Sequence, residues 1–372
     1  MSGKILFVDQ SGGMGGAEMG LQDIAAHFRA RCSVLLLSDG IFRERLEARG
    51  VSVRVLEMPA AVRGVAREGK FSAGMSALPG LLRPVARGYS LARAHDVLYA
   101  NTQKALVVAC LLGAAARRPV IWHLRDILSL EHFQSWLIAL AAFLGNRACA
   151  RVIANSRATA GSFVRAGGWP DRLRVVYNGI DASEFEVAPA EIARDGKFLV
   201  GLFGRLAPWK GQHVLLEALA LAPDVDAIVV GDALFGEDAY AAKIRRLADQ
   251  SRVRLLGFRP DAYALVKACD AIVHTSVAPE PFGRVVVEGM LAGRPVVAAA
   301  AGGVPEIVED GVSGLLVPPG DAAALAAALG RLRDDPALCK RLGEAGRRHA
   351  MAHFSLRAML AGVESVVEEV LR

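Results

Sequence analysis

The sequence lacks the features of a disulfide-rich, metal-binding or membrane-spanning protein. Its five cysteines are an odd number without a Cys-x-x-Cys pair, and no histidine cluster has metal-ligand spacing. The longest apolar run, Trp136 to Gly145, has ten residues, whereas a helix that crosses a bilayer needs roughly 20. We therefore predict no disulfide framework, no metal site and no membrane span. The cysteines are Cys32, Cys110, Cys149, Cys269 and Cys339.

Secretion and common nucleotide-binding motifs are missing as well. Residues 4–9 have a short strand pattern in place of a charged and then apolar leader, which favours a cytoplasmic protein. No G-x-x-x-x-G-K-[ST] loop occurs, and a G-x-G-x-x-G match from Gly13 and Gly15 fails because Glu18 stands at the last position. A dehydrogenase with Asp39 as its ribose acid is therefore disfavoured.

The 372 residues, 53% of them apolar, suffice for two ordinary domains. Apolar, β-branched runs alternate with helical stretches, a pattern typical of parallel sheets covered by helices. We predict an α/β fold with two Rossmann-like domains whose six- or seven-stranded sheets face an interdomain cleft. The expected strands are residues 4–9, 32–39, 51–56, 96–101, 119–124, 151–156 and 174–178, then 198–204, 226–232, 253–258, 271–276, 295–300 and 314–317.

The strand pattern stops between residues 178 and 196, where acidic sequence with alanine and proline intervenes. We place the domains at residues 1–177 and 178–354. The last segment, residues 355–372, has the pattern of one amphipathic helix, and we expect it to pack back onto the first domain.

The net charge of 44 − 38 = +6 is unevenly distributed. Residues 60–95 include six basic residues and one acidic residue, Glu68. This basic stretch predicts contact with an anionic membrane surface or a phosphorylated substrate, with a mobile surface loop as the alternative. Nucleic acid is disfavoured, because only Phe71 and Tyr89 offer stacking rings there. The basic residues are Arg63, Arg67, Lys70, Arg83, Arg87 and Arg93.

Two turns that follow predicted strands have residues suited to anion binding: one contains glycines and the other contains cations. Gly15 and Gly16 end a glycine loop that opens a helix, where backbone N–H groups can approach a pyrophosphate or sugar. Arg205 and Lys210 flank a second strand-to-helix turn, which predicts an anion site. His123 ends an apolar strand, so it is either a structural histidine or one that faces a ligand.

Two carboxylates stand eight residues apart in Glu280-Pro-Phe-Gly-Arg-Val-Val-Val-Glu288. If a helix begins near Gly283, Glu280 lies in the loop at its positive end and Glu288 lies about one and a half turns in. Both acids could then reach one polyhydroxylated ligand; the ordinary alternative is that Glu280 caps the helix and Glu288 is a solvated charge. A glycine turn at residues 301–306 follows the next strand.

Together these motifs resemble glycosyltransferase family 4, the retaining nucleotide-sugar transferases of GT-B fold. The resemblance covers residues 4–371 and is most specific in EPFGRVVVE and GGVPEIVEDGVSGLLVPPGD. It implies that the second domain holds the nucleotide sugar, that the first holds the acceptor, and that no metal or other cofactor takes part. One departure is Pro281, where many members have glycine, and it leaves the sugar open.

By this resemblance each motif residue receives an expected role. Arg205 and Lys210 would bind the donor diphosphate, Glu280 the hydroxyls of the donor sugar, and Glu288 the ribose. His123 would be a cleft histidine. The remaining donor-binding residues would be Gly15, Gly16, Arg259 and the backbone amides of Phe282 and Gly283.

The resulting prediction is a retaining glycosyltransferase that moves a sugar to a hydroxyl acceptor in the assembly of a surface polysaccharide or glycolipid. Its partners would be a nucleotide sugar, a glycan or lipid-linked acceptor and the inner face of the plasma membrane. UDP-sugars are the commonest donors in the family and GDP-mannose the next. The alternatives are a GT-B epimerase or phosphorylase, and a nucleotide-sugar-binding protein without turnover.

Overall fold

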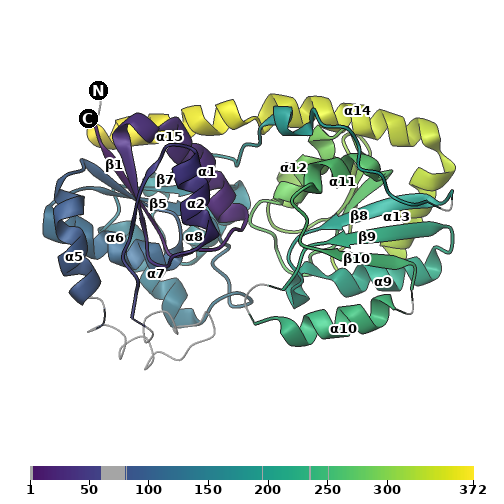
Figure 1. The fold of residues 1–372 in the computed structure, drawn as a ribbon, viewed down its shortest axis with the longest axis horizontal. Helices are drawn as coiled ribbons and strands as arrows, with labels where there is room; N and C mark the ends of the chain where they lie inside the picture. Colours follow the sequence, from purple (N-terminus) through teal and green to yellow (C-terminus); the bar gives the residue numbers. More distant parts are fainter. Residues whose placement is uncertain (1–2, 60–79, 81, 195, 234–235, 250) are drawn as a thin grey trace. The chain divides into compact units, whose positions relative to one another are not determined.

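The computed structural model describes residues 3–59, 80, 82–194, 196–233, 236–249 and 251–372. The chain divides into two compact units, one made of Met1–Gly179 and Arg357–Arg372 and the other of Ile180–Leu356 (Figure 1). The first unit therefore contains both ends of the chain, and the second is an uninterrupted segment.

The first unit is built on a parallel sheet of seven strands in the order β3-β2-β1-β4-β5-β6-β7. Every residue of β1, β4 and β5 is buried. Because successive strand residues point to opposite faces, helices must cover both faces at the centre. The strands are β1 (Ile5–Asp9), β2 (Cys32–Leu36), β3 (Ser52–Val55), β4 (Val97–Ala100), β5 (Val120–Leu124), β6 (Arg151–Ala154) and β7 (Leu173–Val175).

The second unit repeats this plan with six parallel strands in the order β10-β9-β8-β11-β12-β13. The predicted α/β class with two Rossmann-like domains is therefore confirmed, and each of the thirteen expected runs overlaps a strand. The strands are β8 (Phe198–Phe203), β9 (Val225–Val230), β10 (Val253–Gly257), β11 (Ala271–His274), β12 (Val296–Ala299) and β13 (Leu315–Val317).

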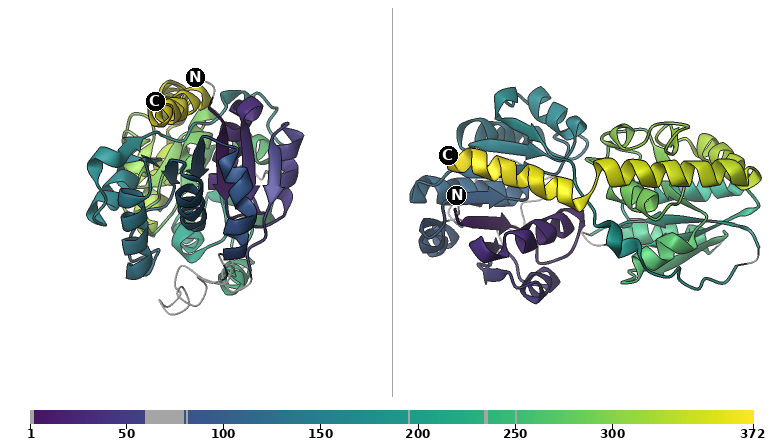
Figure 2. Two further views of the ribbon diagram at one scale, coloured as in Figure 1. Left: turned by 90° about the vertical axis from the view of Figure 1, so that its left-hand side faces the viewer. Right: turned by 90° about the horizontal axis from the view of Figure 1, so that it is seen from above.

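Helices connect successive strands on the two faces of each sheet (Figure 2). Several begin at a side chain that accepts a hydrogen bond from the backbone three residues on, as Thr102, Ser156 and Asp321 do. The first unit has α1 (Gly16–His27), α2 (Ile41–Ala48), α5 (Leu82–Arg93), α6 (Gln103–Ala116), α7 (Ser135–Arg147) and α8 (Arg157–Arg165). The second has α9 (Gln212–Leu221), α10 (Asp238–Ala248), α11 (Ala262–Ala268), α12 (Arg284–Leu291), α13 (Ala322–Asp334) and α14 (Pro336–His353).

The final helix, α15 (Leu356–Leu371), packs on the first unit with one apolar face. Its Glu369 pairs with Arg151 on β6 and Arg174 on β7, at 2.7 and 2.5 Å. A side chain at Gly362 would come within 2.8 Å of Val176, so a glycine is needed where the helix crosses that residue. The chain thus ends against the sheet with which it begins.

Each sheet has one point where the strand order reverses, between β1 and β4 in the first unit and between β8 and β11 in the second. Ligands of doubly wound sheets bind beyond the carboxyl ends of the strands at such a point, because the connecting helices leave on opposite faces there. Asp9 ends β1, and Arg205 follows β8 by two residues. Arg205, one of the predicted site residues, therefore lies where the fold favours a ligand.

Most of the basic stretch lies outside the described residues, which omit 60–79 and 81. Arg83, Arg87 and Arg93 are on α5, and the first two line a cavity of about 310 Å³ beside Met58 and Pro59. Within the described part of the chain, no helix combines the length and the apolar character needed to cross a bilayer. No disulfide links the cysteines, each of which has a free thiol.

Candidate functional site

The loop between β11 and α12 holds Glu280 in a buried position with three polar neighbours. Its Oε2 atom accepts hydrogen bonds from Lys210 Nζ at 2.7 Å and Ser276 Oγ at 3.0 Å, and His274 Nε2 lies 3.3 Å away. Burial alone would raise the pKa of Glu280, but the charge of Lys210 and the contact with His274 hold it well below its usual value. Glu280 is therefore an ionised carboxylate.

Helix α12 begins at Arg284, one residue after Gly283, so the predicted helix start is confirmed. Gly283 has φ 105°, a backbone conformation that favours glycine. Phe282 is buried and its ring packs against Phe354 at 5.7 Å between centroids. The turn therefore has one face anchored in the core of the unit, which fixes the loop that carries Glu280.

Two glycines near Glu280 make room for the protein's own backbone. At Gly302, a Cβ would lie 2.1 Å from the carbonyl oxygen of Glu280, and the neighbouring Gly303 N–H donates to that oxygen at 2.7 Å. At Gly211, a Cβ would lie 2.0 Å from the carbonyl oxygen of Thr275. Glycine richness here reflects close packing of three loops around the carboxylate.

Lys210 belongs to a 3-10 turn, Pro208–Lys210, that is tied to the end of β11. Thr275 Oγ1 donates to the Lys210 carbonyl at 2.9 Å, and the Val277 N–H donates to the Trp209 carbonyl at 2.8 Å. The Lys210 ammonium lies 4.2 Å from the centre of the Trp209 ring, and the Arg205 guanidinium lies 6.0 Å from it. The structure therefore places both predicted cations around one indole.

Arg205 also has an acidic neighbour that the sequence does not indicate. Its Nε lies 3.5 Å from Glu237 Oε1, and both side chains are largely buried. Glu237 immediately precedes α10. The anion site predicted from Arg205 and Lys210 thus contains two cations, each with a carboxylate partner, and an entering phosphate would compete with those partners.

Glu288 lies on α12 beside Arg284, whose Nη2 is 3.5 Å from Glu288 Oε1. Burial raises the pKa of Glu288, and the charges of Arg284 and Lys210 partly offset that effect. Lys210 therefore acts electrostatically on both members of the predicted carboxylate pair. Arg259 lies in the loop after β10 and pairs with Asp261 at 2.6 Å.

In the first unit, Gly15 and Gly16 form the start of α1, with Gly15 as the N-cap. A Cβ at Gly15 would lie 2.9 Å from Glu18 Oε2, so this glycine lets that carboxylate turn back over the helix start. His123 is fully buried on β5, with Nδ1 2.5 Å from the Tyr99 hydroxyl. Burial and the charge of Arg125 hold the pKa of His123 well below its usual value, so the ring is neutral.

A buried polar network surrounds these residues and was not predicted. Asn101, after β4, donates to Asp9 Oδ2 at 2.6 Å and accepts from Arg125 Nε at 2.6 Å, and Arg125 Nη1 donates to Asn178 at 2.9 Å. Burial raises the pKa of Asp9 to about 6, and burial together with the charge of Asp9 raises that of Glu18 to about 7. The only sequence signal was a polar residue at the end of each buried strand.

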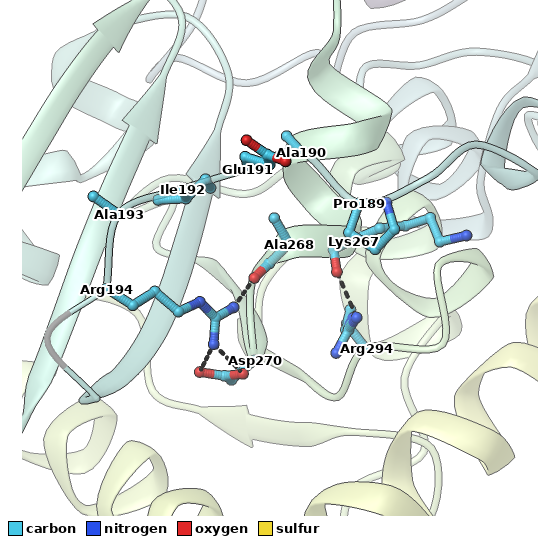
Figure 3. A pocket seen from close by; sticks show the side chains of 10 residues that line it. All are labelled: Pro189, Ala190, Glu191, Ile192, Ala193, Arg194, Lys267, Ala268, Asp270 and Arg294. Atoms are coloured by element: carbon cyan, nitrogen blue, oxygen red, sulfur yellow. Dashed lines mark hydrogen bonds and ion pairs between the residues drawn. The ribbon is translucent and has the colours of Figure 1, made fainter.

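A depression of about 820 Å³ on the second unit contains none of the predicted site residues. Figure 3 shows that its two arginines contact other residues of the protein. Arg194 pairs with Asp270 at 3.0 Å and donates to the Ala268 carbonyl, and Arg294 donates to the carbonyl of Lys267. The Arg194 contacts attach residues 189–194 to the end of α11, and the Arg294 contact joins the segment after α12 to the same helix, which gives the depression a structural explanation.

The fold and these clusters define an α/β protein with two Rossmann-like domains. Two family models match the chain, "Glycosyltransferase Family 4" over residues 14–184 and "Glycosyl transferases group 1" over residues 184–349. A crystal structure of Alr3699/HepE from Anabaena in complex with UDP-glucose is 40% identical, with a TM-score of 0.89 over 99% of this chain and 100% of that one. The chain therefore belongs to glycosyltransferase family 4, and its fold is GT-B.

Curated relatives are matched over part of their length. A D-inositol 3-phosphate glycosyltransferase of Streptomyces bingchenggensis is 34% identical over 60% of this chain and 53% of its own length. The lipopolysaccharide core biosynthesis glycosyltransferase LpsD of Rhizobium meliloti is 34% identical over 53% of this chain and 57% of its own. The chain thus spans about half the length of the curated relatives it matches.

Proposed function

We propose that this protein is a glycosyltransferase that moves a sugar from a nucleoside diphosphate sugar, a UDP-sugar first among the candidates, to a hydroxyl of a glycan or lipid-linked acceptor. The observation that carries the proposal is the group formed by Lys210, Glu280 and Arg205 beyond β8 and β11. The relative crystallised with UDP-glucose, and again with UDP and glucose, supports a uridine nucleotide as donor.

The two cations are proposed to bind the diphosphate and to stabilise it as it leaves. Charge that develops on the leaving oxygen is stabilised most by donors that are already fixed in place. Thr275 after β11 holds the backbone of Lys210, and both cations lie beside the Trp209 ring, so little movement brings their charges to the diphosphate. We propose that this fixed positive charge replaces a divalent cation, so that turnover needs no metal.

Glu280 is proposed to orient the donor sugar by accepting hydrogen bonds from its hydroxyls. As an ionised carboxylate, Glu280 can accept such hydrogen bonds but cannot donate a proton. Membership of glycosyltransferase family 4 favours departure and attack on the same face of the sugar over a covalent intermediate on Glu280. We therefore propose retention of the anomeric configuration.

The remaining assignments follow the same reasoning. We propose that Glu288 holds the ribose, that Gly15, Gly16 and the amides of Phe282 and Gly283 approach the diphosphate, and that Arg259 lies near the base. The second unit would then hold the donor and the first the acceptor, with His123 facing the sugar. The setting we propose is the cytoplasmic face of a membrane where surface glycans or glycolipids are assembled.

A donor panel tests the proposal. The protein is mixed with UDP, GDP and ADP and with UDP-glucose, UDP-N-acetylglucosamine and GDP-mannose, and its melting temperature is measured; a ligand at about 100 times its Kd adds roughly 2.7 kcal/mol of stability. The nucleotide sugar that stabilises the protein is then supplied with a labelled sugar. Steady release of free nucleotide, with the label appearing in an acceptor, supports transfer. Saturable binding without release would mean a binding protein, and an epimerised donor would mean an epimerase.

A further inference from the structure

Glu280 is held through one oxygen only. Lys210, Ser276 and His274 all contact Oε2, and no described residue donates a hydrogen bond to Oε1. A carboxylate oxygen offers about two lone pairs, so Oε2 is saturated and Oε1 keeps its capacity. The side chain is thus oriented before any ligand arrives, with a defined oxygen left to accept a hydrogen bond.

The proton positions in this group follow from the acceptor at its centre. A bare nitrogen at His274 Nε2 would point its lone pair at the ionised Oε2 atom 3.3 Å away, so Nε2 carries the proton. Ser276 Oγ lies 3.0 Å from both Nε2 and Oε2, so the Nε2 proton is shared between Ser276 Oγ and Glu280 Oε2, and the Ser276 hydroxyl donates to the carboxylate. His274 and Ser276 form a continuous donor chain to Glu280.

This chain is anchored in the sheet. His274 is the last residue of β11, paired in register with Ala298 of β12, and both His274 and Ser276 are at least 95% buried, with exposures of 5% and 1%. Lys210, in contrast, reaches Glu280 through four flexible methylene groups and is the partner that an incoming diphosphate would attract. When Lys210 turns to the phosphate, Glu280 keeps only the two donors from the strand end.

We propose that His274 and Ser276 are positioning residues that hold Glu280 Oε2 so that Oε1 faces the donor sugar while Lys210 binds the diphosphate. This inference rests on the proposed function, since it requires a donor sugar at Glu280. Neither residue contacts the nucleotide in this scheme. Their loss therefore misplaces the sugar without weakening the grip on the nucleoside diphosphate.

The test compares His274→Leu, Ser276→Ala and His274→Gln with the parent. Glutamine keeps an N–H donor at about the reach of Nε2, whereas leucine removes it. Ser313→Ala is the matched control, because Ser313 is also a buried serine of the second unit, and its hydroxyl accepts from the Glu309 N–H away from Glu280. Calorimetry measures UDP affinity, rapid quench measures single-turnover transfer from UDP-glucose, and melting temperature monitors folding.

We expect His274→Leu and Ser276→Ala to slow single-turnover transfer at least tenfold while UDP affinity stays within threefold of the parent. His274→Gln should recover most of the rate, and Ser313→Ala should transfer at the parent rate. If His274→Leu does not fold, the comparison of Ser276→Ala and His274→Gln with the parent still tests the inference. Transfer at the parent rate by Ser276→Ala and the histidine variants overturns the inference. A loss of UDP affinity as large as the loss of transfer rate also overturns it. A parent without transfer from any donor overturns the proposed function instead.

Discussion

Removing Lys210 should destabilise the second unit through Glu280, a consequence that the sequence does not predict. The two side chains are 20% and 11% exposed and their charged atoms are 2.7 Å apart. Breaking a buried ion pair by deleting one partner costs about 3–5 kcal/mol. Because Ser276 and His274 still contact Glu280, we expect Lys210→Met to cost about 2–3 kcal/mol, near the lower end of that range.

A double-mutant cycle isolates this interaction. In Glu280→Gln, the group beside Lys210 is neutral, so the further loss of Lys210 should cost little. We expect a coupling energy of at least about 1 kcal/mol between the two positions. Lys210→Met alone should lower the melting temperature of a unit of this size by roughly 4–12 °C. Urea unfolding and calorimetry without ligand measure both quantities.

An exposed pair in the same unit provides the control. Arg333 lies 3.3 Å from Asp224 and 2.8 Å from Asp334, but these two acids are 67% and 65% exposed, so solvent screens both attractions. Arg333→Met should therefore change stability by less than about 0.5 kcal/mol. If Lys210→Met and Glu280→Gln are additive within about 0.3 kcal/mol, the ion pair contributes no specific stability and the reasoning fails.

Three further outcomes are expected. Transfer should continue in EDTA at the rate seen with added magnesium or manganese; activity that EDTA abolishes and manganese restores would remove the proposed role of Arg205 and Lys210. Proton NMR of the first-formed product should show the donor's anomeric configuration, and an inverted anomer would exclude same-face attack. Burial raises the pKa of Asp9 to about 6 and that of Glu18 to about 7, so these acids lose their protons at a higher pH in the folded protein than in the unfolded protein. Stability should fall as pH rises from about 4 to about 7, by about 1.4 kcal/mol per pH unit for each acid in its window, and Asp9→Asn should flatten that slope in urea unfolding.

The fold could be predicted because a parallel sheet buries both faces of its strands. The central strands are unbroken apolar runs, and each of the thirteen expected runs overlaps a strand, in the expected order. In the apolar run at residues 32–39 the strand ends at Leu36, and in the run at residues 271–276 the strand ends at His274. The residues beyond these ends form loops, and in the second case they include Ser276. Local propensity does not distinguish a strand from the loop that continues it.

The sequence predicted the charged residues of the site, but it did not predict the residues that hold them in place. The Lys210–Glu280 contact joins residues 70 positions apart, which no local pattern indicates. Gly302 lies in the glycine turn noted at residues 301–306, and the Glu280 backbone occupies the space that a side chain there would need. His274 and Ser276 look like strand residues in the sequence, and only the fold turns them toward the carboxylate.

The most direct test of the account compares Glu280→Gln with the parent in two measurements made on the same samples. Calorimetry gives the affinity for UDP, and rapid quench gives the single-turnover rate with UDP-glucose or the best donor of the panel. The amide keeps the size of the side chain but loses the anionic acceptor. The account predicts that transfer falls at least a hundredfold, about 2.7 kcal/mol in the barrier, while UDP affinity is unchanged or rises because Lys210 is freed. Transfer at the parent rate would contradict it.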